Sequence, residues 1–181
     1  MIKYFQVEVN ENYTAPQPIG WYGKIDRKSL QGKKAYQMPK HLLFKVEQHM
    51  QMVFTDIIMF PCFMASGMVR GVIEQYASDV RFARAILFDK EKRKSMAYYI
   101  PFLERIEPAE GEAVEHEHKE LKKIFVDEGR LGNRVIAETA DGDKACVIMR
   151  MDLVESILRR GAVGIGIKEV EVVRGFGGGG R

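Results

Sequence analysis

Residues 144–173, KACVIMRMDLVESILRRGAVGIGIKEVEVV, predict a strand, a helix and a second strand in direct succession. Apolar residues recur at helical spacing in the middle of this stretch, which gives the helix one buried face. Asp152 is the expected N-cap residue, with Glu155 placed to complete a capping box. Gly161 suits the left-handed position after the last turn. Because so short a helix is marginal alone, we expect it to pack on the two strands.

The rest of the chain is predicted to form mostly strands joined by short turns. Alternating or continuous apolar residues predict these strands at residues 1–9, 56–59, 82–89, 96–106, 121–127 and 134–138. Asp141-Gly142 is a typical hairpin turn into the strand that begins at Lys144. Such short connections favour antiparallel pairing.

A second helix is predicted over residues 68–76, where apolar residues recur at i, i+3, i+4 and i+7 and Ser66 is placed as the N-cap. Residues 42–54 fit a helix and a strand equally, so a third short helix near residues 40–50 is an alternative. We therefore expect the α+β class, a mainly antiparallel β-sheet with two or three short helices packed on it.

The composition is that of an ordinary globular protein, with 46% hydrophobic and 29% charged residues in a chain of 181. We expect one domain over residues 1–173, with 1–55 as a loop-containing N-terminal subregion and 174–181 as a flexible glycine-rich tail. No signal peptide or membrane span is recognised, which predicts a cytoplasmic protein. Cys62 and Cys146 are isolated in apolar runs and are expected to be buried thiols.

No motif for catalysis, a cofactor or a metal is present, so we predict no enzyme and no cofactor. Asp56, Asp89 and Asp127 stand at strand ends, where catalytic carboxylates often occur, but the sequence pairs none of them with another group. His116 and His118 have the spacing of two metal ligands on one face of a strand. No third ligand stands at a fixed spacing from them, and no His-Glu-x-x-His helix is present, so a solvated loop is favoured instead.

Five residues are the candidates for binding a partner. Trp21 and Tyr22 form an aromatic pair, and aromatic residues dominate binding hot spots. Burial in the core is the alternative for this pair, and the average burial of large aromatic residues favours it. Arg93 in a basic turn and Arg159 and Arg160 at a helix end supply positive charge. Ordinary solvated surface is the alternative for each arginine.

The order of motifs over residues 56–172 resembles the eleventh class of immunity proteins linked to bacterial polymorphic toxins. The motifs that carry this resemblance are Asp56-Ile57-Ile58, Ser66 opening a helix, Tyr98-Tyr99-Ile100-Pro101, Lys122 to Asp127, and Gly164 to Val170. The resemblance implies a small cytoplasmic protein that binds a cognate toxin, or a diverged relative with another partner, and it supplies no catalytic residues. The N-terminal third matches the family only loosely, and its Trp21-Tyr22 pair and basic stretch are not assigned to the family.

We therefore expect a non-enzymatic protein-binding domain of the immunity type, with no membrane partner. The alternative is a nucleic-acid-associated or regulatory module, based on the basic stretch 24–40 and the Arg-Gly tail. A third possibility is a metal-dependent or hydrolytic enzyme that uses His116 and His118. The net charge of +3 is interspersed and does not by itself indicate nucleic acid.

Overall fold

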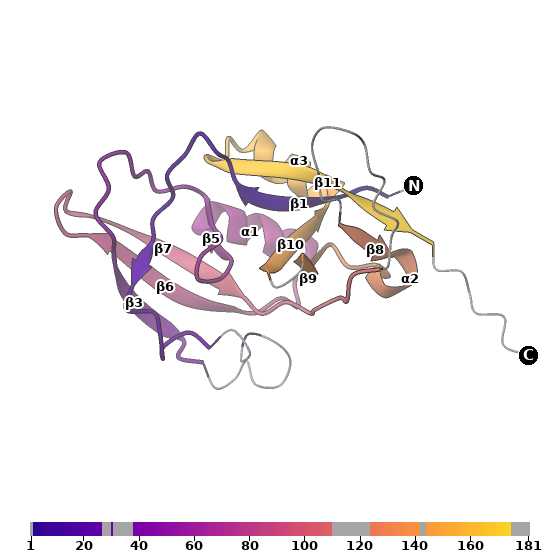
Figure 1. The fold of residues 1–181 in the computed structure, drawn as a ribbon, viewed down its shortest axis with the longest axis horizontal. Helices are drawn as coiled ribbons and strands as arrows, with labels where there is room; N and C mark the ends of the chain where they lie inside the picture. Colours follow the sequence, from indigo (N-terminus) through magenta and orange to yellow (C-terminus); the bar gives the residue numbers. More distant parts are fainter. Residues whose placement is uncertain (1, 27–29, 31–37, 110–123, 142–143, 175–181) are drawn as a thin grey trace, which may run out of the picture.

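Two curled β-sheets and two principal helices make up the fold (Figure 1). The computed structural model describes residues 2–26, 30, 38–109, 124–141 and 144–174. The first sheet has the order β2-β3-β6-β7-β5-β4 and the second has the order β8-β11-β1-β10-β9. The strands of the first sheet are β2 (Pro18–Ile19), β3 (His41–Val46), β4 (Ile57–Ile58), β5 (Met64–Ser66), β6 (Phe82–Asp89) and β7 (Lys94–Pro101). Those of the second are β1 (Tyr4–Val9), β8 (Phe125–Asp127), β9 (Ile136–Asp141), β10 (Lys144–Arg150) and β11 (Ile165–Val173).

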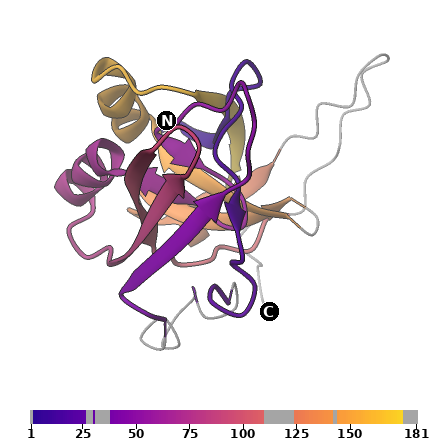
Figure 2. The same cartoon turned by 90° about the vertical axis from the view of Figure 1, so that its left-hand side faces the viewer.

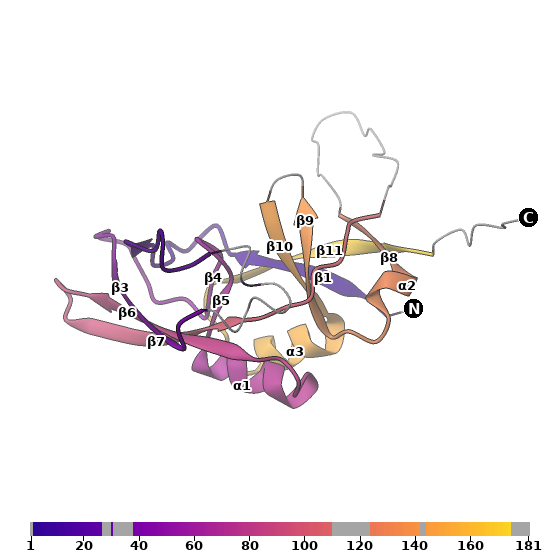
Figure 3. The ribbon, with the colours of Figure 1, turned by 90° about the horizontal axis from the view of Figure 1, so that it is seen from below.

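Helices α1 (Gly67–Tyr76) and α3 (Met151–Arg159) lie side by side on one side of the molecule (Figures 2 and 3). Beneath them is a core to which both sheets contribute. A second core fills the opposite face of the six-stranded sheet, and a third fills the opposite face of the five-stranded sheet. Strand β1 alternates between two cores as its sequence predicts, with Tyr4 in the third and Val7 in the first.

The α+β class and the mainly antiparallel pairing are confirmed, but the strands form two sheets and not one. Each sheet also contains a parallel pair, β3 with β6 and β8 with β11. The predicted alternative of a helix near residues 40–50 is also wrong. Residues 41–46 form β3, in which Leu42, Phe44 and Val46 are buried in alternation. The third helix is instead the single turn α2 (Glu128–Leu131), where the sequence indicated only a turn.

Residues 144–173 form the predicted strand, helix and strand, but the strands are not neighbours, because β1 lies between them and pairs antiparallel with both. Helix α3 accordingly packs on β1, β10 and α1. The predicted N-cap is wrong, since Arg150 holds that position without a side-chain cap. The Asp152 carboxylate instead accepts two hydrogen bonds of 2.8 Å from the Arg150 guanidinium. Gly161 adopts the predicted left-handed conformation, with φ of +74°.

The predicted cap of α1 is confirmed. The Ser66 hydroxyl accepts a hydrogen bond of 3.3 Å from the Val69 amide, and α1 begins at the next residue, Gly67. Val69, Val72 and Ile73 are buried as their spacing predicts. This cap fixes the point at which β5 passes directly into the helix.

The two sheets repeat one arrangement of strands. In the first, β5 leads through α1 to β6, and β7 lies between the two strands and pairs antiparallel with both. In the second, β10 leads through α3 to β11, and β1 takes the central place. A parallel strand flanks β6 and β11, and an antiparallel strand flanks β5 and β10. The chain thus contains two copies of one unit, and the N-terminal strand completes the second copy.

The register of the strands agrees with this repeat at single residues. Tyr98 of β7 lies opposite Ser66, and Tyr4 of β1 lies opposite Arg150. Ser66 and Arg150 are the N-cap residues of α1 and α3. Equivalent positions in the two copies can therefore be compared directly.

Candidate functional site

Three aromatic side chains, Trp21, Tyr22 and Phe60, form a stacked group that we call the aromatic cluster. The Trp21 ring meets the rings of Tyr22 and Phe60 edge to face, with centroid distances of 6.0 and 5.5 Å. Tyr22 is 88% exposed and Phe60 is 47% exposed. Trp21 is half-buried and packs against the core on the face of the six-stranded sheet opposite the helices. The cluster thus presents two exposed rings on an anchored base.

A tight turn holds the cluster in place. Gly20 and Gly23 flank the Trp-Tyr pair with φ of +71° and +77°, a conformation that side chains with a Cβ rarely adopt. The backbone amides of Lys24 and Ile25 both donate to the Trp21 carbonyl at 3.0 Å. The Ile25 side chain is buried in the core just beyond the turn. The turn therefore directs the Tyr22 side chain outward from the core.

Sequence reasoning found two of the three cluster residues. Burial of the Trp21-Tyr22 pair was the favoured alternative, and it is wrong for Tyr22, because the turn directs that ring into solvent. Phe60 was not predicted, since it stands in the apolar run 57–64 with buried residues. An edge-to-face stack buries little of the outer rings, which stay available to a second molecule.

The predicted arginines lie elsewhere. Arg93 is exposed in the turn between β6 and β7, with φ of +49°. Arg159 and Arg160 are exposed at the end of α3, where Arg160 donates to the Ser156 carbonyl and hydroxyl at 2.8 and 2.6 Å. Helix α3 packs in the core beneath the helices, and Trp21 packs against the core on the other side of the six-stranded sheet. The five predicted residues therefore do not form one site.

Asp56 joins the two repeats. One carboxylate oxygen accepts a hydrogen bond of 2.6 Å from the Ser66 hydroxyl, and the other accepts one of 2.6 Å from the Val163 amide. Both partners belong to the framework, at the start of α1 and after α3. The geometry assigns Asp56 a structural task.

Asp89 and Asp127 also serve the backbone. Asp89 is buried and accepts hydrogen bonds of 3.0 Å from the amides of Lys92 and Glu91 in the β6–β7 turn. These bonds, the Lys92 amide first, hold the pKa of Asp89 below its ordinary value, because they favour the charged carboxylate. Asp127 caps α2 by accepting from the Arg130 amide at 3.0 Å. These contacts are all with backbone amides, and none of them brings the carboxylate of Asp89 or Asp127 to a group that could take part in catalysis.

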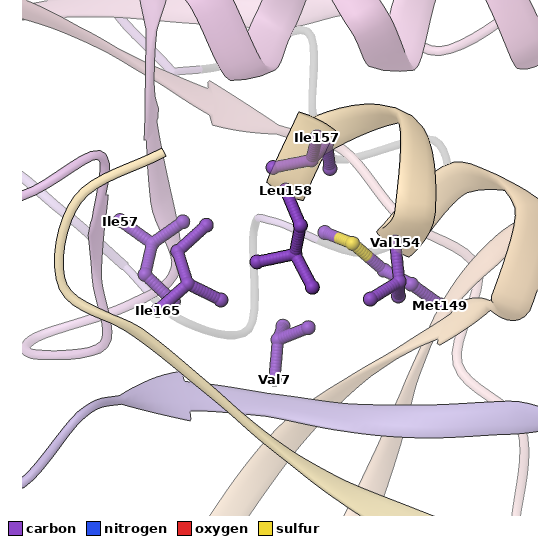
Figure 4. Close-up of a pocket in the computed structure, with 7 residues that line it drawn as sticks. All are labelled: Val7, Ile57, Met149, Val154, Ile157, Leu158 and Ile165. Carbon is purple, nitrogen blue, oxygen red and sulfur yellow. The ribbon is translucent and has the colours of Figure 1, made fainter. Parts of the chain in front are cut away.

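A small cavity lies between α3 and the strands below it. Figure 4 shows aliphatic side chains and Met149 converging on this space from α3, β1, β4, β10 and β11. Its volume is about 10 Å³, room for about one water, and no polar side chain lines it. It provides no group that could orient or activate a ligand.

A larger open depression, of about 310 Å³, is lined by three arginines. Arg134 forms an ion pair with Glu104 and donates to the Arg130 carbonyl at 3.0 Å. Arg105 lies 3.7 Å from the Glu107 carboxylate. Oxygen atoms of the chain itself thus already engage these guanidinium groups.

The described residues contain no group of three or more His, Cys, Asp or Glu placed to hold a metal ion. His116 and His118, the alternative metal ligands, lie outside the described residues. Cys146 is buried, as predicted, whereas Cys62 is half-buried, so the prediction of a buried thiol is wrong there.

In the part of the chain that the structure describes, no helix has the length and apolar character needed to cross a membrane. No family model matches the chain, and a search of curated proteins finds no match. Function is therefore inferred from the surface of this chain, where the aromatic cluster is the strongest candidate for binding.

Proposed function

We propose that this protein acts by binding rather than by catalysis and that a second protein docks on the aromatic cluster. The observation that carries the proposal is the Tyr22 ring, which is 88% exposed and meets the half-buried Trp21 ring edge to face. Because the turn already orders the backbone at Tyr22, a partner that covers this ring pays less to order the segment. Aromatic anchors of this kind supply much of the affinity of protein interfaces.

The motif order over residues 56–172 supports a particular class of partner. Its resemblance to the eleventh class of toxin-linked immunity proteins favours a bacterial toxin that this protein neutralises in the cytoplasm by binding. The aromatic cluster lies mainly outside that stretch, since only Phe60 belongs to it. The proposal therefore assigns partner recognition to the N-terminal turn and the scaffold to the part that carries the resemblance.

The test is an affinity pull-down with the full chain from the cells that make it, read by mass spectrometry. The wild type is compared with Tyr22→Ala, Phe60→Ala and the control Tyr76→Ala, which truncates an exposed tyrosine on α1. We expect the wild type and the control to recover one protein partner. Recovery with Tyr22→Ala falls about tenfold or more, as truncation of an interface anchor does.

Three results would contradict the proposal. Equal recovery of the partner by Tyr22→Ala and the control would exclude the aromatic cluster as the binding site. Recovery of nucleic acid that is lost as salt rises would favour the nucleic-acid-associated alternative. Turnover of a substrate by the purified protein would exclude a purely binding function.

A further inference from the structure

The internal repeat places two equivalent sheet surfaces at opposite ends of the molecule. Figure 1 shows the β3–β6–β7 end of the first sheet far from the β8–β11 end of the second. Each surface lies on the side of its sheet that carries the helix of that repeat. The two surfaces can therefore be compared position by position.

On the first sheet this surface is apolar at its centre and positively charged around it. Leu43 is 58% exposed, and the neighbouring Ile19 is 53% exposed. Helix α1 covers only the far end, where the Arg70 guanidinium lies 4.5 Å from the centre of the Tyr99 ring. Strands β2, β3, β6 and β7 direct no acidic side chain to this side. We call this surface the basic face: Leu43, Lys45, Arg84, Ile86 and Phe88.

The equivalent surface of the second sheet carries the opposite charge. The strand register that places Lys45 on the basic face places Asp127 at the equivalent position of the second repeat. In the same way Arg84 corresponds to Glu169. Leu43 and Phe88 correspond to the apolar residues Phe125 and Val173, whereas Ile86 corresponds to Glu171. We call this surface the acidic face: Phe125, Asp127, Glu169, Glu171 and Val173.

The acidic face remains open to a new partner. Glu169 pairs with Lys3 at 2.7 Å, and both side chains are more than half exposed. Exposed ion pairs of this kind are weak and exchange partners readily. A cation of another molecule can therefore take the place of Lys3 at Glu169.

We propose that a second copy of this chain covers the basic face with its acidic face. Charge complementarity favours this occupant, since Lys45 and Arg84 of one copy would meet a face of another copy that carries Glu169 and Glu171. Two basic faces would instead place like charges together. Because the paired surfaces differ, the contact is head-to-tail and generates a ring or a filament. The proposal does not depend on the aromatic cluster.

Sedimentation of the purified full chain over a range of concentrations tests this proposal. We expect the average mass to rise above that of the monomer with concentration and to fall as salt is added. Lys45→Glu with Arg84→Glu, and separately Glu169→Lys with Glu171→Lys, should each weaken self-association about tenfold or more. Mixing the two variants restores association, because each then supplies the face that the other lacks. Arg159→Glu, at an exposed side chain near the end of α3, serves as the charge-reversal control and should leave association unchanged.

A wild type that stays monomeric at every concentration would overturn the proposal. So would two face variants whose mixture fails to associate although each is folded by circular dichroism. Association abolished by nuclease would identify nucleic acid as the occupant of the basic face. Tyr22→Ala should leave self-association intact, so failure of this proposal and failure of the proposed function are distinguishable.

Discussion

Tyr4 and Tyr98 occupy equivalent positions in the two repeats and make the same hydrogen bond. The Tyr98 hydroxyl donates to the Thr55 carbonyl at 2.7 Å, and the Tyr4 hydroxyl donates to the Arg134 carbonyl at 2.6 Å. Each carbonyl belongs to the residue two positions before the outer antiparallel strand of its sheet, β4 or β9. A central strand thus fixes an outer strand in both copies by one tyrosine.

Removal of this hydroxyl should destabilise the fold. Tyr98→Phe leaves the buried Thr55 carbonyl without this donor, which costs about 1–3 kcal/mol of the free energy of unfolding. Tyr4→Phe should act in the same direction. Urea denaturation checks both, with Tyr13→Phe, an exposed tyrosine, as the control. A loss for Tyr98→Phe no larger than that of the control would contradict the structural role of this bond.

Two glycines offer a matched test of backbone strain against steric exclusion. Gly161 and Gly164 have φ of +74° and +77°, but only at Gly164 would an added Cβ meet a neighbour, 2.8 Å from the Thr55 Cβ and closer to its Cγ2. Gly161→Ala should cost about 1–2 kcal/mol through backbone strain alone. Gly164→Ala should cost clearly more, as measured by chemical denaturation. If both variants lost the same free energy of unfolding, the Thr55 side chain would be able to move aside at no cost, which would contradict steric exclusion at Gly164.

Asp56→Ala should loosen the contact between the repeats. The change removes two hydrogen bonds to a charged carboxylate, from the Ser66 hydroxyl and the Val163 amide. Each such bond contributes about 1.5–3 kcal/mol. Hydrogen exchange read by NMR should show faster exchange of the Val163 amide in the variant. Unchanged protection of that amide would mean that Asp56 does not hold the loop after α3.

The Arg150–Asp152 pair should contribute to acid sensitivity. The hydrogen bonds from the Arg150 guanidinium hold the pKa of Asp152 below its ordinary value of 3.8. The unfolded chain then binds more protons than the folded chain as pH falls below about 4, so the stabilisation present at neutral pH is lost there. Asp152→Asn should be less stable at neutral pH and lose less stability on acidification. Urea titrations across this range check it, and an identical acid dependence in both proteins would contradict it.

The local patterns predicted much of the fold. Ser66 and the spacing of Val69, Val72 and Ile73 identified α1, because the cap and the buried face are short-range signals. The repeat escaped detection because its second copy takes its central strand from the other end of the chain. The parallel pairs β3–β6 and β8–β11 were not predicted either, because pairing between segments far apart in the sequence leaves no local pattern.

The candidate site was predicted in part. Trp21 and Tyr22 stood out as an aromatic pair, but only the turn between Gly20 and Gly23 decides which ring is exposed. Phe60 contacts Trp21 although the two residues are far apart in the sequence, and the spacing of residues cannot predict such a contact.

The most direct test of partner binding is photo-crosslinking from position 22 in the cells that make the protein. A photoreactive phenylalanine replaces Tyr22 in the full chain, and a second variant carries it at the exposed position of Tyr76 on α1. We predict one protein adduct from position 22 and none from position 76. The absence of an adduct at position 22, or the same adduct from both positions, would contradict a partner docked on the aromatic cluster.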